Sequence, residues 1–435
     1  MQRKFWNELL MWKDQNLKIP LMVIGARQIG KTYIINKFCK ENFKDYIYIN
    51  LMDNERIIEI FNESINTEEK IKKMELYLNH LITEDTIIFF DEIQESEKLI
   101  SALKYFCEAE FPYKIICAGS LLGVKLKRFQ SSFPVGKVII KYMYPMSFEE
   151  FLVAIQYQNI ISEIQKCYEE NLKMSNPIHE KLLEYYRLFL CTGGMPAAVN
   201  NIVENGLQIL KFNNDILTSI IDAYQADMKK YTLNYYETVK IEKIYKNIPS
   251  QLAKENKKFQ FSKIDKQARR RDYETSLDWL MASQLVTPCY FVNKFETPLK
   301  GFVEEEKFKL YLSDVGILTE LLEISRNKIL LNDDFQYKGV ITENYVANEL
   351  RTNGLSLYYW AENQVAEIDF LIDIDKGVIP IEVKANENKK SKSLNYFMKE
   401  KSIDFAIRIS ANNFGFANGI KSIPLYATFC IDNLH

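Results

Sequence analysis

The sequence contains few of the residues that build zinc and disulfide sites. Three histidines occur in 435 residues, and the seven cysteines form no C-x-x-C pair. A structural zinc site needs four nitrogen or sulfur ligands in close spacing, so the sequence argues against one. Scattered cysteines inside apolar runs are typical of reduced core residues, and we expect a protein of a reducing compartment.

The sequence also lacks long uncharged apolar runs and a strong net charge. No run approaches the roughly 18 residues of a membrane-spanning helix, and the first residues, Met1 to Trp6, lack the apolar core of a signal peptide. The formal net charge is -2, so any nucleic-acid contact must come from a local basic patch. We therefore expect a cytoplasmic protein without a membrane partner.

Glycine is scarce as well, with 15 in 435 residues, yet two of them frame a conspicuous motif. Residues 25–32, GARQIGKT, match G-x-x-x-x-G-K-[ST] and stand between an apolar run at 21–24 and an apolar-periodic segment at 33–39. Strand, loop and helix are the context that a phosphate-binding loop requires. The loop N–H groups and the positive end of the helix are suited to cradle a polyphosphate.

This loop predicts a nucleotide site in which ATP and Mg²⁺ are the cofactors. Lys31 should reach the β- and γ-phosphates, and Thr32 should coordinate Mg²⁺. The residues expected to bind the nucleotide are Gly25, Ala26, Arg27, Gln28, Ile29, Gly30, Lys31, Thr32 and Tyr33.

A second strand signal ends in the residues expected to act in hydrolysis. Residues 86–92, TIIFFDE, form an apolar run closed by two acids, and a buried parallel strand opens its carboxyl end toward a ligand crevice. We assign Asp91 to the Mg²⁺ shell and Glu92 to the general base that polarises the attacking water. The next strand ends at Ser120, which either senses the γ-phosphate or caps the following segment.

Strands that alternate with helical segments through this region predict an α/β fold with a parallel sheet covered on both faces. Several phrases also resemble a prokaryotic family of AAA-type ATPases: the phosphate loop, IIFFDEIQ, AGSLLG, SFPVGK at 132–137, YPMSFEEF at 144–151 and TGGMP at 192–196. The resemblance implies an AAA-like ATPase core, a small helical region and a C-terminal domain of poorly defined function. Members often carry an arginine after FPVG, where this chain has Lys137, which cannot form the bidentate fork of an arginine finger. The nearby Arg128 is the other candidate, or part of a solvated basic turn.

Changes of pattern along the chain predict four segments. An ATPase core at 1–190 is followed by a helical lid or connector at 191–236, a winged helix at 237–320 and an α/β domain at 321–435. Gly193, Gly194 and Pro196 predict the end of a helix and a reverse turn. In the winged helix, three helical segments precede strands at 285–290 and 308–312. The arginines at 269–271 either contact DNA phosphates or lie on a solvated helix face.

The C-terminal segment carries a second set of acids. Glu343 lies in a helical segment at 339–350, and strand segments at 367–372 and 378–384 are joined by a turn. Because side chains alternate along a strand, a hairpin brings Asp369 beside Glu382 and puts Glu382 and Lys384 on one face. An acid followed by Glu-x-Lys on the next strand resembles the restriction-endonuclease-like, PD-(D/E)xK, fold.

This second resemblance implies a metal-dependent nuclease site. Glu343, Asp369 and Glu382 would hold Mg²⁺ against a phosphodiester, and Lys384 would orient or activate water. Glu-x-Lys is also common on half-exposed strands, and the fold hosts both cutters and binders.

Two functions follow from these motifs. The first is an ATP-hydrolysing AAA-type protein that couples its nucleotide state to a nuclease-like domain acting on DNA. The alternative is an ATP-dependent regulatory switch whose C-terminal domain binds protein or nucleic acid without cleavage. The sequence leaves an oligomer and a protein partner open.

Overall fold

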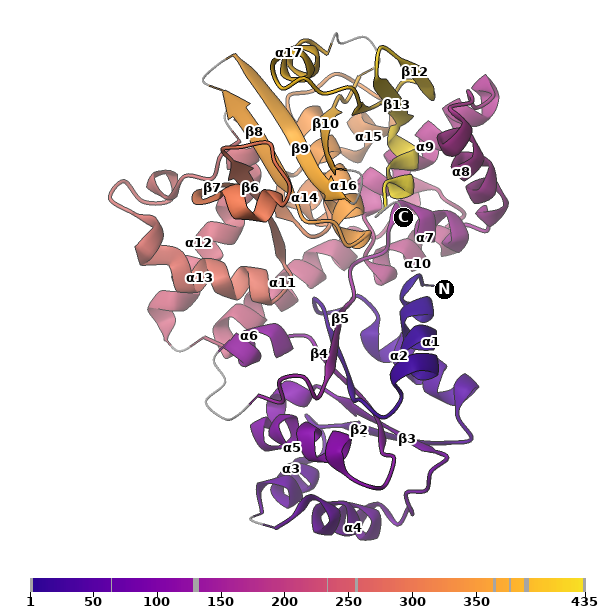
Figure 1. The fold of residues 1–435 in the computed structure, drawn as a ribbon, viewed down its shortest axis with the longest axis vertical. Coiled ribbons are helices and arrows are strands. Elements are labelled where there is room, and N and C mark those ends of the chain that lie inside the picture. Colours follow the sequence, from indigo (N-terminus) through magenta and orange to yellow (C-terminus); the bar gives the residue numbers. More distant parts are fainter. Residues whose placement is uncertain are drawn as a thin grey trace. The chain divides into compact units, whose positions relative to one another are not determined.

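The computed structural model describes residues 3–63, 65–127, 133–232, 234–254, 257–362, 365–374, 377–386 and 391–432 (Figure 1). Arg128, the second candidate for an arginine finger, lies outside these residues. The chain divides into two compact units, one made of 2–144 with 282–284, the other of 145–281 with 285–435. The finer division into four segments stays a prediction.

The first unit contains a five-stranded parallel sheet, which confirms the predicted parallel sheet and adds β5, a strand that the sequence analysis did not predict. Its strand order is β2-β3-β4-β1-β5, and every described pair is parallel. This order brings the ends of β1 and β3 to the same edge of the sheet, separated by β4. The strands are β1 (Leu21–Ile24), β2 (Asp45–Asn50), β3 (Thr86–Asp91), β4 (Lys114–Gly119) and β5 (Ile139–Tyr142).

Helices complete this unit and cover its buried strands. All residues of β1 and β3 are buried, as continuous apolar runs in a parallel sheet require. Phe61, Phe90 and Phe106 bring two helices and β3 into one aromatic contact. The helices are α1 (Phe5–Asn16), α2 (Lys31–Asn42), α3 (Glu55–Asn62), α4 (Thr67–Leu78), α5 (Glu97–Glu108), α6 (Leu122–Lys127) and the 3₁₀ helix η1 (Ile93–Glu95).

The second unit is built on a mixed sheet of eight strands in the order β12-β13-β11-β10-β9-β8-β6-β7. The pairs β6–β8, β10–β11 and β11–β13 are parallel, and the other described pairs are antiparallel. The strands are β6 (Val286–Val292), β7 (Val303–Leu312), β8 (Tyr358–Glu362), β9 (Ala366–Ile374), β10 (Gly377–Val383), β11 (Ala406–Ser410), β12 (Gly415–Ala417) and β13 (Ile420–Pro424).

The two strands expected to form a wing are β6 and β7, and they pair as an antiparallel hairpin. In addition, Tyr290 and Phe291 of β6 pair with Tyr358 and Tyr359 of β8. The hairpin is therefore the edge of the same sheet that holds the C-terminal strands.

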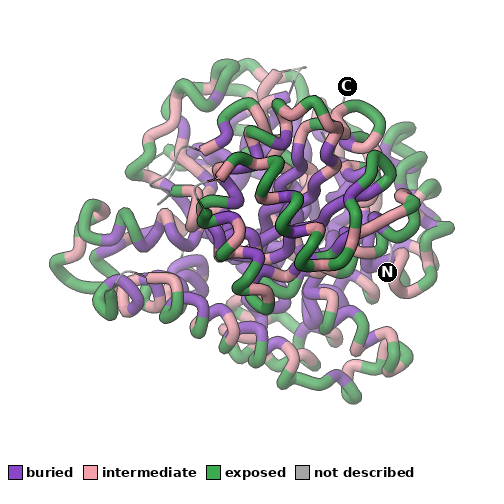
Figure 2. The backbone as a smooth tube through the Cα atoms, turned by 90° about the horizontal axis from the view of Figure 1, so that it is seen from below, coloured by how far each residue is buried: buried purple, intermediate pink, exposed green. Residues whose placement is uncertain are grey.

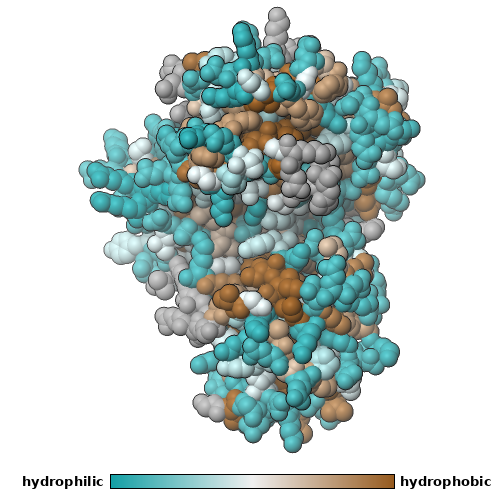
Figure 3. Space-filling view, in the orientation of Figure 1, coloured by the Kyte–Doolittle hydropathy of each residue, from teal (hydrophilic) through white to brown (hydrophobic). Residues whose placement is uncertain are grey.

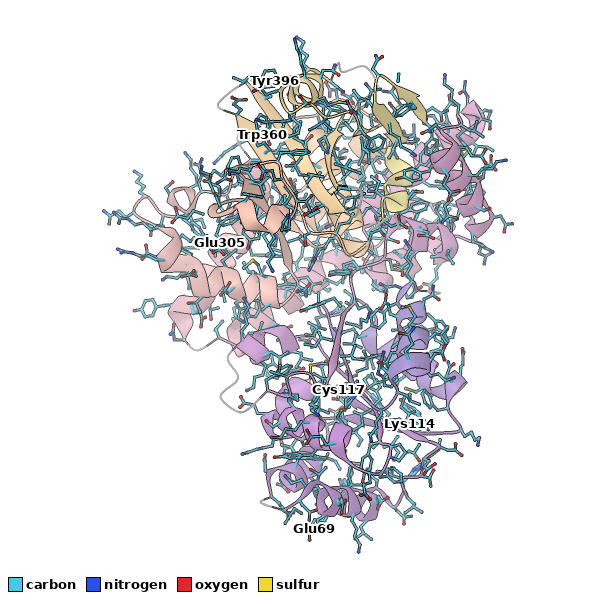
Figure 4. All side chains as sticks on the ribbon, viewed as in Figure 1. Glu69, Lys114, Cys117, Glu305, Trp360 and Tyr396 are labelled. Atoms are coloured by element: carbon cyan, nitrogen blue, oxygen red, sulfur yellow. The ribbon has the colours of Figure 1, made fainter. Side chains whose placement is uncertain are left out.

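Helices pack around this sheet. Most of them contain both buried and exposed residues, which Figure 2 shows as purple and green stretches of the backbone. Trp360 of β8 packs on Phe397 of α17, with ring centroids 4.7 Å apart (Figure 4). The helices are α7 (Phe148–Ala154), α8 (Ile161–Glu170), α9 (Asn176–Thr192), α10 (Pro196–Glu204), α11 (Asp215–Lys230), α12 (Tyr235–Leu252), α13 (Arg270–Ala282), α14 (Val315–Leu321), α15 (Arg326–Leu330), α16 (Lys338–Thr352) and α17 (Lys392–Glu400). The 3₁₀ helices are η2 (Gln158–Ile160), η3 (Ile209–Lys211), η4 (Phe261–Lys263), η5 (Leu299–Phe302) and η6 (Leu425–Cys430).

The molecular surface is mainly hydrophilic in the view of Figure 3, with smaller apolar patches between the polar side chains. None of the helices that the structure describes has the length and apolar character of a membrane-spanning segment.

A buried aspartate holds the turn that the TGGMP phrase predicts. Helix α9 ends at Thr192 and α10 begins at Pro196. Between them, the N–H of Gly194 donates to Oδ2 of Asp314 at 2.6 Å, while Oδ1 of Asp314 accepts the N–H of Ile317 at 3.0 Å and caps α14. One carboxylate therefore satisfies backbone donors from two segments that are far apart in the sequence.

Asp314→Asn should change the pH dependence of stability. Burial raises the pKa of Asp314 to about 6, although three backbone hydrogen bonds act to lower it; the unfolded chain keeps the ordinary pKa of about 4. Because the folded pKa is higher, the stabilising contribution of this group is complete below pH 4 and is lost as the pH rises through 6. Asparagine does not ionise. Between pH 4 and 7.5, wild type should therefore lose about 2–3 kcal/mol of unfolding free energy relative to the variant.

Urea unfolding at several pH values measures this difference. The asparagine amide faces the N–H of Gly194, so the variant should also show a constant loss of stability at every pH. Parallel profiles for the two proteins would contradict the prediction.

Candidate functional site

The phosphate loop joins β1 to α2 with a backbone that its second glycine permits. Gly30 has a φ of 89° and is the N-cap of α2, a left-handed conformation that side chains disfavour. Lys31 is the first helical residue, so the N–H groups of the first helical turn lie next to the loop. Ala26 and Ile29 are buried, whereas Arg27, Gln28 and Tyr33 are exposed.

The side chain of Lys31 lies within the loop. It is 7% exposed, and its Nζ donates hydrogen bonds to the carbonyl oxygens of Gly25 and Ala26 at 2.8 and 2.7 Å. The ammonium group is therefore held at the place where the sequence predicts the phosphates of a nucleotide.

Thr32 and Asp91 meet across the sheet edge, as the sequence predicts for two residues of one magnesium site. Thr32 Oγ1 donates to Asp91 Oδ2 at 2.7 Å, and Tyr48 OH of β2 donates to the same oxygen at 3.2 Å. Burial raises the pKa of Asp91, opposed by the hydrogen bond from Thr32. A hydroxyl next to a carboxylate is the oxygen donor pair that P-loop ATPases offer to Mg²⁺, so these residues fit the ion.

Glu92 follows Asp91 and is oriented by its own neighbours. Its N–H donates to Asp91 Oδ1 at 3.0 Å, and its Oε2 accepts Gln94 Nε2 at 2.6 Å. Gln94 is buried and reaches the end of β4: a Cβ on Gly119 would lie 2.1 Å from Gln94 Oε1. Ser120, also buried, is the next residue. The expected base and the expected γ-phosphate sensor thus belong to adjacent strand ends.

Arg3 is a component of this site that sequence reasoning missed. Its Nη1 donates to the carbonyl oxygen of Ile29 at 2.7 Å, and its Nη2 donates to that of Tyr144 at 2.6 Å. The side chain is buried, so it fixes the loop to the segment that follows β5. No local pattern marks an arginine ahead of an amphipathic helix for this task.

The candidate arginine-finger position is occupied by an ion pair. Lys137 Nζ lies 3.1 Å from Glu108 Oε1, and both side chains are about half exposed. The finger therefore stays unassigned among the described residues.

The second predicted site lies in the other unit, where α16 places Glu343 against the sheet. Glu343 contacts Lys257 Nζ, and its Oε1 accepts Tyr311 OH at 2.5 Å and lies 3.3 Å from Lys309 Nζ. Burial opposes ionisation of Glu343, but the two ammonium groups and the hydrogen bonds outweigh it and lower its pKa. Glu343 is therefore a buried carboxylate surrounded by positive charge.

The expected hairpin is confirmed by the antiparallel pairing of β9 and β10, in which Ile381 is opposite Phe370. This register puts Asp369 across from Glu382. Asp369 Oδ2 accepts the N–H of Val383 at 2.9 Å, and its Oδ1 lies 3.7 Å from Lys257 Nζ. Burial and the neighbouring Glu343 raise the pKa of Asp369.

Glu382 and Lys384 form their own ion pair. Lys384 Nζ lies 2.9 Å from Glu382 Oε1, whereas Glu382 Oε2 is buried without a hydrogen-bond partner. The structure thus gathers Glu343 and Asp369 around Lys257 and pairs Glu382 with Lys384. Within the described parts of the chain, no three His, Cys, Asp or Glu side chains converge as a metal site would require.

Sequence reasoning missed the lysines and the tyrosine of this cluster. Lys309 is 1% exposed and joins Glu343 to Glu367 of β9, whose Oε1 lies 2.5 Å from its Nζ. A signal existed: Lys309 and Tyr311 alternate within the apolar strand 308–312 and so share one face. Because a buried charge is unfavourable unless it is paired, a lysine on the buried face of a strand predicts an acidic side chain nearby.

A cavity of about 1010 Å³ opens beside this cluster. Lys309 and Glu367 belong to both, so the cavity borders the cluster on this side. The walls also contain Phe291, Tyr359 and Lys307.

The arginines at the start of the predicted recognition helix make local contacts. Arg270 donates to the carbonyl oxygen of Glu305, labelled in Figure 4, and lies 3.5 Å from its carboxylate. Arg271 Nε lies 3.8 Å from Asp272. Both contacts are exposed or partly exposed, and DNA contact by these residues stays a prediction.

Arg3→Met should weaken ATP binding and reduce stability. The variant removes two hydrogen bonds from a charged donor to buried carbonyl groups, a loss of about 2–3 kcal/mol in unfolding free energy. A less firmly held loop should raise KM for ATP several-fold and change kcat less. Steady-state kinetics and urea unfolding measure both effects, with the exposed Arg56→Met as the matched control. A stability loss with unchanged KM would show that Arg3 does not position the loop.

Three family models match separate stretches of the chain. Residues 18–152 match the family model of an AAA domain, residues 183–328 a domain of unknown function (DUF8612), and residues 338–428 another domain of unknown function (DUF4143). An uncharacterized protein of Methanocaldococcus jannaschii is 25% identical over 388 residues, which cover 87% of this chain and 78% of that protein.

Solved structures show weaker similarity. A Walker-type ATPase of Pyrococcus abyssi gives a TM-score of 0.45 at 16% identity, covering 74% of this chain and 95% of that one. The ORC2 protein of Aeropyrum pernix gives 0.36 at 12% identity, covering 75% and 91%. The RuvB branch migration motor of Thermotoga maritima gives 0.30 at 12% identity, covering 77% and 96%. By the matches to the three family models, the chain carries an AAA-type P-loop ATPase domain followed by two domains of unknown function.

Proposed function

We propose that this protein binds and hydrolyses ATP with Mg²⁺ in the cytoplasm and uses its nucleotide state to control a C-terminal nuclease that acts on DNA. The contact of Thr32 Oγ1 with Asp91 Oδ2, beside Lys31 at the head of α2, carries the first half of the proposal. It brings the two halves of a nucleotide site together at one sheet edge.

In hydrolysis, Lys31 exchanges its bonds to the loop carbonyls for the β- and γ-phosphate oxygens of ATP. Thr32 and Asp91 would hold Mg²⁺, and the ion would neutralise charge that develops on the phosphates. Glu92, oriented by Gln94, accepts a proton from the attacking water. Ser120 at the end of β4 contacts the γ-phosphate side of the site.

The nuclease half rests on the β9–β10 hairpin. Asp369 and Glu382 are opposite each other, and Lys384 lies next to Glu382. In this proposal Glu343, Asp369 and Glu382 would be the carboxylates that face Mg²⁺, an ion that prefers hard oxygen ligands, although within the described residues they do not converge on one point. Mg²⁺ would supply charge stabilisation at a phosphodiester, and Lys384 would orient the attacking water.

One observation favours a second function. Lys257 and Lys309 already neutralise Glu343. Such ion pairs stabilise a binding domain that has no catalytic metal, and they equally suit a nuclease that is not active. In this alternative the protein is an ATP-dependent switch whose C-terminal domain binds protein or nucleic acid without cleavage.

Two substitutions test the ATPase. Lys31→Ala should abolish nucleotide binding and lower ATP turnover at least about 100-fold, whereas Glu92→Gln should keep binding and lower kcat by about 100-fold or more. Phosphate release and binding of a fluorescent ATP analogue separate the two effects. Lys37→Ala on the same helix, where Lys37 is exposed, is the control. Wild-type turnover in Lys31→Ala would refute the assignment.

Cleavage of plasmid and single-stranded DNA with Mg²⁺ or Mn²⁺ tests the nuclease. Asp369→Asn should abolish nicking, and Lys31→Ala should alter its dependence on ATP, because nucleotide state controls the domain. The exposed Asp404→Asn is the control in the same unit. If wild type turns over ATP but cuts no DNA, the switch function replaces the nuclease.

A further inference from the structure

A second, smaller cavity of the same unit is lined by residues of α9, α15 and α16. Its volume is about 50 Å³, and its described lining shares no residue with the ion pairs around Glu343. One water molecule needs about 10–15 Å³ of such space, so the cavity has room for a ligand of about four to six non-hydrogen atoms.

Most of the wall of this cavity is apolar. Helix α9 contributes Leu183 and Leu190, and α16 contributes Ile341. Tyr186 and Thr342 also belong to the wall, but the hydroxyl of Tyr186 donates to Thr342 Oγ1 at 3.4 Å. The greater part of a ligand bound here would therefore contact aliphatic side chains, which suits an alkyl group.

The charge of the wall has one sign. Arg187 of α9 and Lys338 of α16 line the cavity, and its described lining contains no aspartate or glutamate. Two positive charges without an acid between them give the cavity a positive potential, which favours an anion.

Arg187 also has an unused hydrogen-bond donor. Its Nε is buried, and no acceptor for it exists among the described residues. Burial lowers the pKa of the guanidinium, opposed by the charge of Glu184, but Glu184 Oε2 lies 3.0 Å from Lys181 Nζ. A buried donor without a partner is unfavourable, and the planar fork of a guanidinium matches the two oxygens of a carboxylate.

We propose that this cavity binds a short-chain aliphatic carboxylate. The carboxylate oxygens accept hydrogen bonds from Arg187, Lys338 adds a second positive charge, and the alkyl chain lies among the apolar side chains of α9 and α16. Inorganic phosphate fits less well, because it has no apolar part and carries more oxygens that need hydrogen-bond donors. The proposal depends neither on ATP hydrolysis nor on nuclease activity.

Titration of the full-length protein with sodium butyrate at constant ionic strength tests the ligand class. Saturation-transfer-difference NMR follows binding of butyrate and n-butanol, and phosphate is assayed by its competition with butyrate. Butyrate should bind saturably in the millimolar range. The uncharged n-butanol and inorganic phosphate should each bind at least about tenfold more weakly. If either binds as tightly as butyrate does, the assignment to a carboxylate is overturned.

Two variants of the cavity test the place of binding. Arg187→Gln removes the charge and the fork and should raise the Kd for butyrate at least about tenfold. Ala411→Leu keeps Arg187 but fills the cavity, which Ala411 lines, and should abolish saturable binding. Arg271→Gln, at an exposed arginine of α13, is the control and should bind as wild type does.

Urea unfolding shows whether each variant is folded. Should Arg187→Gln fail to fold, Ala411→Leu decides the question, because it leaves every charge of the wall in place. Butyrate that binds to a folded variant of either cavity residue with the Kd of wild type would refute the proposed site.

Discussion

The parallel register of the first unit is the constraint on which its chemistry depends. Because β1 and β3 flank β4 and run in the same direction, the phosphate loop and the acids at the end of β3 lie at the same end of the sheet. At that end of the sheet, the hydrogen bond from Thr32 to Asp91 joins the start of α2 to the end of β3. Two short sequence signals separated by more than fifty residues therefore act as one site.

This part of the molecule was predictable because its signals are local and mutually dependent. An apolar strand, a glycine-framed loop and a helix follow each other directly. The apolar run before Asp91 and Glu92 is a weak signal by itself, and it indicates a nucleotide site only together with that loop. The structure confirms the parallel sheet, and in it Thr32 donates a hydrogen bond to Asp91. Sequence reasoning missed Arg3 because its partners are backbone carbonyl groups. Every residue has such a group, so no residue type in the sequence marks the partners.

The second unit was predicted less completely, for a reason that lies in its topology. The hairpin of β9 and β10 follows from strand alternation and a turn, and its register puts Asp369 opposite Glu382. The partners of Glu343 come from β7 and from the segment at Lys257. These pairings are long-range, and periodicity within one segment says nothing about which distant strand becomes its neighbour.

The shared sheet has a consequence for the independence of the C-terminal strands. Because β6 pairs with β8, the hairpin of β6 and β7 covers an edge that belongs to the C-terminal part of the fold. A fragment that began after residue 320 would carry β8 with unpaired backbone groups along one side, a surface that recruits other strands. It would also lack Lys309 and leave Glu343 buried beside Asp369 without this countercharge. The domain of unknown function at 338–428 thus completes its sheet with strands from the domain at 183–328.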